Sequence, residues 1–152
     1  MTRWTTRDVV LALVVLLTAC GQAPVVPAAI DTRHDACRFC RMTVSDLRFA
    51  AQIVAPGDEP LAFDDLGCLR DYLRGGGTMR AEAVVFVADH LTREWVRADS
   101  AVFTRVDTLA TPMSSHVIAH RDKASRDRDP DARGGAAVSA REIVPAAGGP
   151  TP

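Results

Sequence analysis

The fold is decided by residues 61–77, which read LAFDDLGCLRDYLRGGG. The first three residues predict a short apolar strand, and Asp64 and Asp65 then offer a helix N-cap with favourable negative charge. The helix expected over residues 66–73 places its large apolar side chains on one face. These are Leu66, Leu69, Tyr72 and Leu73, with Cys68 beside them. The glycines at 75–77 end the helix.

The flanking residues add strands to this helix. Residues 47–54 alternate loosely between apolar and polar side chains, which predicts a strand. Residues 56–60 contain two prolines, a glycine and an aspartate, and therefore predict a turn that leads into residues 61–63. Residues 83–87 are a near-continuous apolar run, which is typical of a buried strand. The expected order is strand, strand, helix, strand.

The second part of the chain reads as a degenerate copy of this unit. A charged helix is expected over residues 122–132, and Pro130 weakens its end. We predict an α+β fold of two small ββαβ halves, about 35–90 and 91–143. The strands expected in the second half are residues 93–96, 101–104, 115–120 and 136–138.

The N-terminal residues have the pattern of a bacterial lipoprotein signal peptide. Arg3 and Arg7 precede an apolar run at 9–17, which is too short to cross a bilayer, since a span takes about 20 apolar residues. Small residues then lead to Cys20, so we expect residues 1–19 to be removed and Cys20 to be lipidated. The aspartate that often follows the cysteine of inner-membrane lipoproteins is missing. We expect a lipid anchor in the cell membrane or outer membrane, facing the periplasm, with the outer membrane favoured.

The segments on either side of the expected domain, residues 35–143, are poor in large apolar residues. Residues 20–34 read as a flexible tether, and residues 144–152 as a disordered tail. Removal of residues 1–19 takes away two arginines and one aspartate, so the formal charge changes from −1 to −2. Because no basic stripe remains and aromatic residues are few, we expect no nucleic-acid partner.

The stretch CRFCRM, residues 37–42, contains two thiols and a thioether. These soft ligands select Cu(I) over harder divalent ions. A thiolate from Cys40 would neutralise the charge of Cu(I), and thioethers from Met42 and the distant Met113 would keep the ion exchangeable. Cys37 is a further candidate ligand, and so is His116, because imidazole also suits copper.

The cysteine count leaves an odd thiol. Lipidation of Cys20 leaves Cys37, Cys40 and Cys68, which is an odd number for an exported protein. A bound soft metal would protect the unpaired thiol. A disulfide between Cys37 and either Cys40 or Cys68, with the third cysteine buried and inert, is the alternative. The sequence does not choose between these pairings.

The same residues are also compatible with other roles. Met42 and Met113 could fill a core, and Cys37 and Cys40 could be a redox pair, although no helix is evident at this motif. A zinc site would need a second ligand pair, and covalent haem attachment would need histidine in place of Arg41. Helix capping is sufficient to explain Asp64 and Asp65. The remaining histidines are expected at the surface: His34, His90 and His120.

Together these motifs resemble the NosL family, the copper-binding lipoproteins of nitrous oxide reductase maturation. The resemblance rests on the motifs in order over most of residues 17–120. They are the lipobox ending in Cys20, Cys37-x-x-Cys40-x-Met42, Phe63-Asp64-Asp65-x-x-Cys68, Trp95 and Pro112-Met113. The chain departs from the family pattern at two positions, because Arg41 and Ser114 stand where the family usually has glycine.

The resemblance implies two ββαβ halves related in fold to the organomercurial lyase MerB. It implies that Cys40, Met42 and Met113 belong to the metal region, and that the cargo is Cu(I). The implied partners are periplasmic nitrous oxide reductase and other copper-assembly proteins. We therefore expect a membrane-anchored carrier and not an enzyme. The alternatives are a periplasmic thiol–disulfide oxidoreductase using Cys37 and Cys40, and a lipoprotein in which the same pair is only a structural disulfide.

Overall fold

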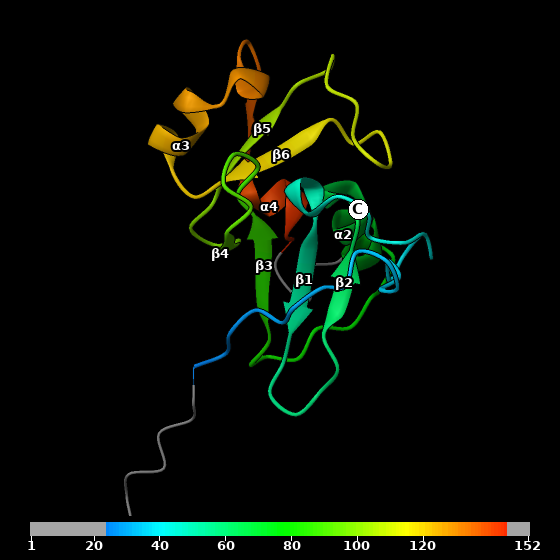
Figure 1. Ribbon diagram of the computed structural model, residues 1–152. Helices are drawn as coiled ribbons and strands as arrows, with labels where there is room; N and C mark the ends of the chain where they lie inside the picture. The colour runs from blue at the N-terminus through cyan, green and yellow to red at the C-terminus, as the bar shows by residue number, and fades with distance from the viewer. Residues whose placement is uncertain (1–23, 146–152) are drawn as a thin grey trace, which may run out of the picture.

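The computed structural model describes residues 24–145, which form an α+β fold with two antiparallel sheets (Figure 1). The first sheet has the strand order β2-β1-β3-β4, and its neighbouring strands all pair antiparallel. Its strands are β1 (Ala51–Val54), β2 (Leu61–Phe63), β3 (Val84–Ala88) and β4 (Trp95–Arg97).

The second sheet repeats the topology of the first three strands. Its order is β6-β5-β7, again antiparallel, so each unit is a hairpin followed by a helix and a return strand on the far side of the hairpin's first strand. The predicted ββαβ repeat is present in both sheets. The strands here are β5 (Val102–Arg105), β6 (Val117–His120) and β7 (Ala136–Val138).

Helix α2 (Leu66–Arg74) begins and ends as its sequence predicts. The Asp65 side chain accepts a hydrogen bond from the Gly67 N–H at the N-cap, and Gly75 is the C-cap. Leu66 and Leu69 are buried against the first sheet. The shorter helices are η1 (Leu47–Phe49), α3 (Lys123–Arg128), η2 (Pro130–Ala132) and α4 (Ala140–Ile143).

Three segments differ from the sequence-based expectation. Residues 47–49 form the 3-10 helix η1 and not the start of a strand, because the Asp46 carboxylate caps the Arg48 N–H. The helix expected over 122–132 breaks at Asp129, since proline follows it and begins η2. Strand β4 pairs with β3, so it belongs to the first sheet although its residues lie in the second part of the chain. Helix α4 was not expected.

The two sheets share one hydrophobic core. Buried Phe63 and Leu69 of the first unit lie in the same cluster as Phe103, Val117 and Ile143 of the second. Burying side chains of this size stabilises by about 1.5–3 kcal/mol each, so neither unit keeps its apolar face covered without the other. A common core therefore holds the two copies in a single domain.

Residues before Asp35 also contact this domain. The Gln52 side chain of β1 bonds both the N–H and the carbonyl of Ala28, and Ile30 packs against the core. Part of the expected tether therefore lies on β1. The expected signal peptide, Cys20 and most of the expected tail lie outside the described residues. Within residues 24–145, none of the helices has the length and apolar character needed to span a bilayer.

Candidate metal centre

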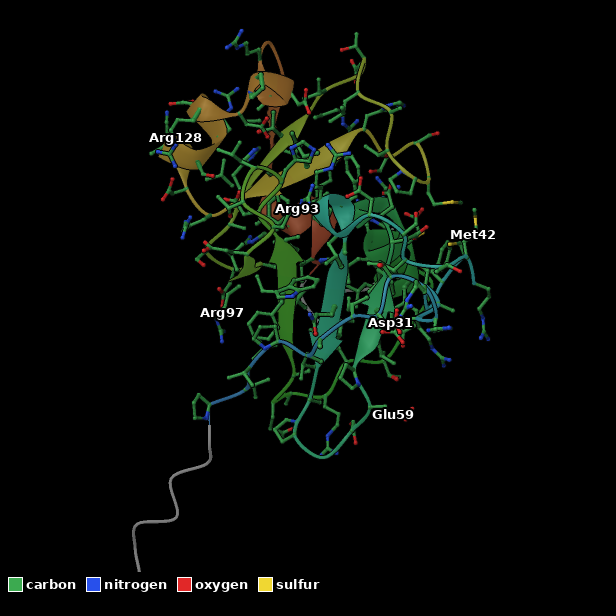
Figure 2. All side chains as sticks on the ribbon, in the orientation of Figure 1. Asp31, Met42, Glu59, Arg93, Arg97 and Arg128 are labelled. Carbon is green, nitrogen blue, oxygen red and sulfur yellow. The ribbon has the colours of Figure 1, made fainter. Side chains whose placement is uncertain are left out.

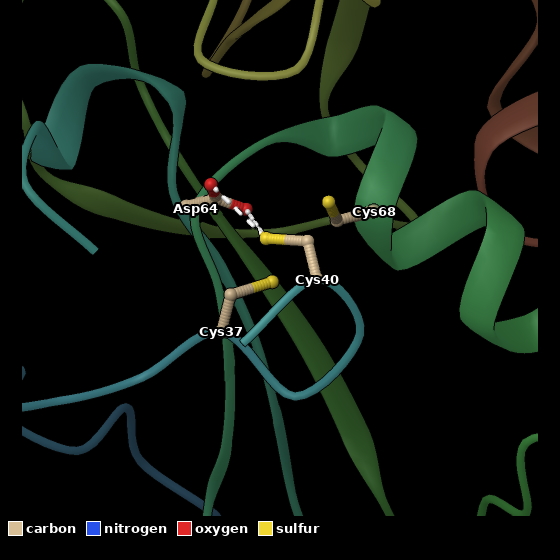
Figure 3. Close-up of side chains that lie close together, drawn as sticks. All are labelled: Cys37, Cys40, Asp64 and Cys68. Carbon is tan, nitrogen blue, oxygen red and sulfur yellow. Dashed lines mark hydrogen bonds between the residues drawn. The ribbon is translucent and has the colours of Figure 1, made fainter. Parts of the chain in front are cut away.

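A tight loop places the first two thiols. Its ends are joined by the bridge between Ala36 and Thr43, and the Cys37 N–H donates to the Met42 carbonyl at 2.7 Å. Within the loop, the Arg41 N–H donates to the Cys37 carbonyl at 3.0 Å. The loop thereby turns both thiols of Cys37 and Cys40 toward the same side (Figure 3).

A second segment supplies two more donors. Asp64 follows β2, and Cys68 lies in the first turn of α2. The Arg38 N–H donates to the Ala62 carbonyl of β2 at 2.7 Å, which holds the cysteine loop beside that strand. This contact between distant parts of the chain brings the loop to the start of α2.

The side chains of Cys37, Cys40, Asp64 and Cys68 converge at this point (Figure 3). One donor atom from each lies within 4.8 Å of the others, a grouping that could hold a metal ion. The Cys40 Sγ lies 3.5 Å from both Asp64 carboxylate oxygens. The three cysteines of the described chain are free thiols, so no disulfide occupies the cluster.

The thiols are not electrostatically equivalent. A hydrogen bond from Cys68 lowers the pKa of Cys37 to about 6, although burial opposes this shift. Donating that hydrogen bond, together with burial, raises the pKa of Cys68. Burial also raises the pKa of Cys40. The hydrogen bond from Cys68 therefore favours the thiolate form at Cys37, while burial favours the thiol form at Cys40.

The donor set combines soft sulfur with one harder carboxylate oxygen. Thiolates suit Cu(I) and Zn(II), and carboxylate alone suits harder ions, so the three sulfurs decide the class of metal. Cys37, Asp64 and Cys68 are buried, whereas Cys40 is half-buried. An ion would therefore reach the cluster past Cys40.

The two candidate methionines lie on the outside of the molecule. Met42 is 56% exposed and Met113 is 42% exposed, so neither fills the core. Figure 2 shows Met42 at the edge of the molecule. Met113 lies in the loop between β5 and β6, and its N–H donates to Asp65 Oδ2 at 3.0 Å. Asp65 adjoins Asp64 in the sequence, so this hydrogen bond anchors the loop of Met113 next to the thiol cluster.

The positions that depart from the family pattern have left-handed backbones. Arg41 has φ 69° and Ser114 has φ 56°, a region that glycine enters without the steric cost of a Cβ. His116 shares this conformation, with φ 57°. Its Nδ1 lies 2.8 Å from the Leu109 carbonyl oxygen, and its ring is not part of the thiol cluster.

Sequence reasoning missed two residues of the cluster. Asp64 was explained as a helix cap, but Asp65 alone caps α2, and the Asp64 carboxylate faces Cys40. The sequence places Cys68 in the family motif and among the possible disulfide partners, but does not assign it to the metal. Their joint occurrence in Phe63-Asp64-Asp65-x-x-Cys68 was the available signal, since it places an acid and a thiol four residues apart around a helix start.

The expectation that the three lone histidines lie at the surface holds for only one of them. His34 is exposed and pairs with Asp31. His90 is 3% exposed and His120 is fully buried, because each lies where β3 and β6 approach one another in the interior.

Comparison with known proteins identifies the family of this chain. The model of the NosL family matches residues 27–147, which is most of the chain. No curated protein and no solved structure matches the chain, so its likeness to MerB stays an expectation. The matched region contains both sheets and every residue of the thiol cluster. The chain therefore belongs to the NosL family.

Proposed function

We propose that this protein is a membrane-anchored Cu(I) metallochaperone, which delivers copper to periplasmic nitrous oxide reductase during its assembly. The observation that carries the proposal is the convergence of three free thiols and the Asp64 carboxylate within 4.8 Å. Soft thiolates suit Cu(I) and Zn(II). Family membership supports copper as the cargo.

The arrangement suits a carrier. The deep thiols, Cys37 and Cys68, would protect Cu(I) from solvent, while the half-buried Cys40 leaves one side open. Met42 is two residues from Cys40, and the loop of Met113 is held beside the cluster through Asp65. Both thioethers are exposed, and a thioether binds Cu(I) without adding charge. Exchange from buried thiolates through exposed thioethers to a docked acceptor would let the ion leave without passing through water.

The acceptor and the anchor are part of the same proposal. Lipidation of Cys20 would hold the domain at the periplasmic face of a membrane, where nitrous oxide reductase and other copper-assembly proteins are expected as partners. Mass spectrometry of the mature protein should find an acylated Cys20 as its first residue, and a Cys20→Ala chain should carry no lipid. An unmodified Cys20 in the mature protein would contradict the lipid anchor but not the metal site.

Copper transfer tests the function. Cu(I)-loaded protein is mixed with metal-free nitrous oxide reductase, the two are separated, and copper is measured in each. We expect copper on the reductase in amounts that track the loaded protein. No transfer, with copper retained on this chain, would refute delivery and leave a storage role.

Variants assign the ligands. Cys40→Ser should abolish Cu(I) binding, and Met113→Leu should weaken it without unfolding the domain. Met79→Leu is the matched control, because Met79 packs against the hydrophobic core and lies outside the thiol cluster. Unchanged copper affinity in both Cys40→Ser and Met113→Leu would overturn the assignment.

The second candidate is a thiol–disulfide oxidoreductase, which the lowered pKa of Cys37 favours. The Cys37 thiolate would attack a substrate disulfide, form a mixed disulfide and release the first substrate thiolate. Cys40, after losing its proton, would then attack the Cys37 sulfur and release the second substrate thiolate, which leaves a Cys37–Cys40 disulfide and a reduced substrate. Cys37 is fully buried, however, so a substrate sulfur reaches Cys40 first. Insulin reduction by the copper-free protein, with no Cu(I) binding, would favour this candidate.

A further inference from the structure

A second cluster of metal-ligating side chains lies apart from the thiols, where the two sheets meet. His90 follows β3, and His120 is the last residue of β6. The backbone N–H of His90 donates to the Ala119 carbonyl at 2.8 Å, and Asp89 forms a parallel β-bridge with Ala119. Figure 1 shows the end of β3 approaching the end of β6, with α3 nearby. Asp129, between α3 and η2, completes the cluster.

Two imidazoles meet at one carboxylate oxygen. Asp129 Oδ2 lies 2.6 Å from His90 Nδ1 and 2.8 Å from His120 Nε2. The other oxygen, Oδ1, accepts the Asp131 N–H at 3.0 Å, which fixes the carboxylate and leaves Oδ2 to the imidazoles. His90, His120 and Asp129 are 3%, 0% and 2% exposed, and one donor atom from each lies within 4.8 Å of the others.

Hydrogen bonds alone do not satisfy this cluster. The second ring nitrogens, His90 Nε2 and His120 Nδ1, are buried and have no hydrogen-bond partner among residues 24–145. Burying a polar atom without a partner costs about 1–3 kcal/mol. These two nitrogens point away from Asp129, so the atoms that can share an ion are the three that converge: His90 Nδ1, His120 Nε2 and Asp129 Oδ2.

We propose that His90, His120 and Asp129 form a second metal site, which takes a divalent transition-metal ion such as Zn(II). Two imidazoles and one carboxylate are a ligand set for Zn(II). The ion would replace the hydrogens between the imidazole nitrogens and Oδ2. It would tie the first sheet, through His90, to the second, through His120 and Asp129.

The present geometry is close to what such an ion needs. With metal–ligand distances of about 2.0–2.2 Å, tetrahedral ligands lie about 3.3 Å apart, so the nitrogens and Oδ2 need to separate by less than one ångström. The surroundings are ordered and anionic. Asp89 is a second buried carboxylate, which accepts hydrogen bonds from the Ser125 hydroxyl and the Arg121 N–H and holds the start of α3 beside His120.

The two clusters differ in whether they suit Cu(I). The thiol cluster offers three sulfurs and suits Cu(I) as well as Zn(II), whereas this cluster offers two nitrogens and one oxygen and has no sulfur. Occupation of the thiols by Cu(I) is therefore separable from occupation of this cluster by Zn(II). The second site is a structural one, since its ligands are buried and exchange of its ion would be slow.

Zn(II) titration of the nitrogen-15-labelled protein, followed by NMR of the imidazole nitrogens, tests the proposal. Because the thiols can also take Zn(II), we expect the signals of His90 Nδ1 and His120 Nε2 to shift within two equivalents of Zn(II). His34 is the matched control, because its Nδ1 also meets an aspartate oxygen at 2.8 Å but is exposed, and its signal should stay. Unshifted His90 and His120 signals in excess Zn(II) would overturn the proposal.

A variant pair adds an independent readout. Asp129→Asn should lower the Zn(II) retained after gel filtration by one equivalent, and Asp31→Asn should not change it. Equal retention in both would contradict the site. If Asp129→Asn does not fold, the wild-type NMR titration still decides. Cu(I) added to the thiols should leave both imidazole signals in place, so failure of this proposal is distinguishable from failure of the copper assignment.

Discussion

The Asp65 carboxylate accepts the backbone N–H of Met113 at 3.0 Å, although the two residues lie 48 positions apart in the chain. The same oxygen accepts the Thr111 hydroxyl at 2.7 Å, and the other oxygen caps α2 through the Gly67 N–H at 2.6 Å. One buried side chain therefore fixes both the start of the helix that carries Cys68 and the loop that carries Met113.

Replacing Asp65 with alanine should affect both stability and copper binding. The change removes the N-cap of α2 and leaves the Thr111 hydroxyl and the Met113 N–H without their acceptor. The free energy of unfolding should therefore fall by about 3 kcal/mol in total. Cu(I) affinity should fall as in Met113→Leu, because the loop is released. Urea unfolding and Cu(I) competition measure the two effects.

Asp122→Ala is the control for this change, since Asp122 caps α3 in the same way but is exposed and does not contact the β5–β6 loop. The free energy of unfolding of Asp122→Ala should fall by about 1 kcal/mol, and its copper affinity should be unchanged. Equal copper affinities for both variants would show that Asp65 is only a cap.

Cys37 should be ionised at neutral pH in the metal-free protein, because its pKa is lowered to about 6 by the Cys68 hydrogen bond. The ultraviolet absorbance of the thiolate should therefore titrate near pH 6. Cys68→Ala removes the donor, and the pKa should rise to the ordinary value of about 8.5 or above. Cys40→Ala is the control, and its thiolate absorbance at pH 7 should equal that of the wild type. A single titration near pH 8.5 in every variant would refute this account.

Arg41→Gly should be neutral or stabilising, because the φ of 69° costs a side-chain-bearing residue about 1 kcal/mol that glycine avoids. It should also strengthen Cu(I) binding, since it removes a positive charge from the cysteine loop. Arg38→Gly removes the same charge from the same loop at a residue without positive φ. It should therefore lower the free energy of unfolding. Greater stability in Arg38→Gly than in Arg41→Gly would contradict the backbone argument.

Asp89 should make folding sensitive to acid. Burial favours its neutral form, but hydrogen bonds from the Arg121 N–H, the Ser125 hydroxyl and the Thr92 N–H outweigh burial and lower its pKa to about 2. The folded pKa lies below the unfolded value of about 3.9, so the stabilisation is complete above pH 4 and is lost as the pH falls through 2. We expect the free energy of unfolding to fall by about 2 kcal/mol as this stabilisation is lost.

Urea unfolding at a series of pH values measures the Asp89 effect. Asp89→Asn should be less stable at pH 7 and should lose less stability below pH 4 than the wild type. Asp58→Asn, at an exposed turn, should follow the wild-type curve. Identical acid dependence in wild type and Asp89→Asn would contradict the assignment.

Local patterns in the sequence predicted most of the fold. The cap at Asp65, the apolar face of α2 and the end at Gly75 depend on neighbours within one or two turns, and they were identified correctly. The start of β1 was not, because the Asp46 cap turns residues 47–49 into a 3-10 helix, and a loose apolar pattern does not distinguish this from a strand.

The site was less predictable than the fold. The Cys37–Cys40 pair is visible in the sequence, whereas its meeting with Asp64 and Cys68 depends on the long-range hydrogen bond between Arg38 and Ala62. The burial of His90 and His120 likewise depends on how β3 approaches β6, which no local pattern encodes. Whether Met42, Met113 and His116 bind the ion stays a prediction.

The central claim is that the thiol cluster binds Cu(I). It is tested most directly by titrating the reduced protein against a chromogenic Cu(I) chelator, with Cys40→Ser and Met79→Leu alongside. We predict that the wild type and Met79→Leu withdraw one equivalent of Cu(I) from the chelator, and that Cys40→Ser withdraws none. Failure of the wild type to compete at any ratio would contradict the account.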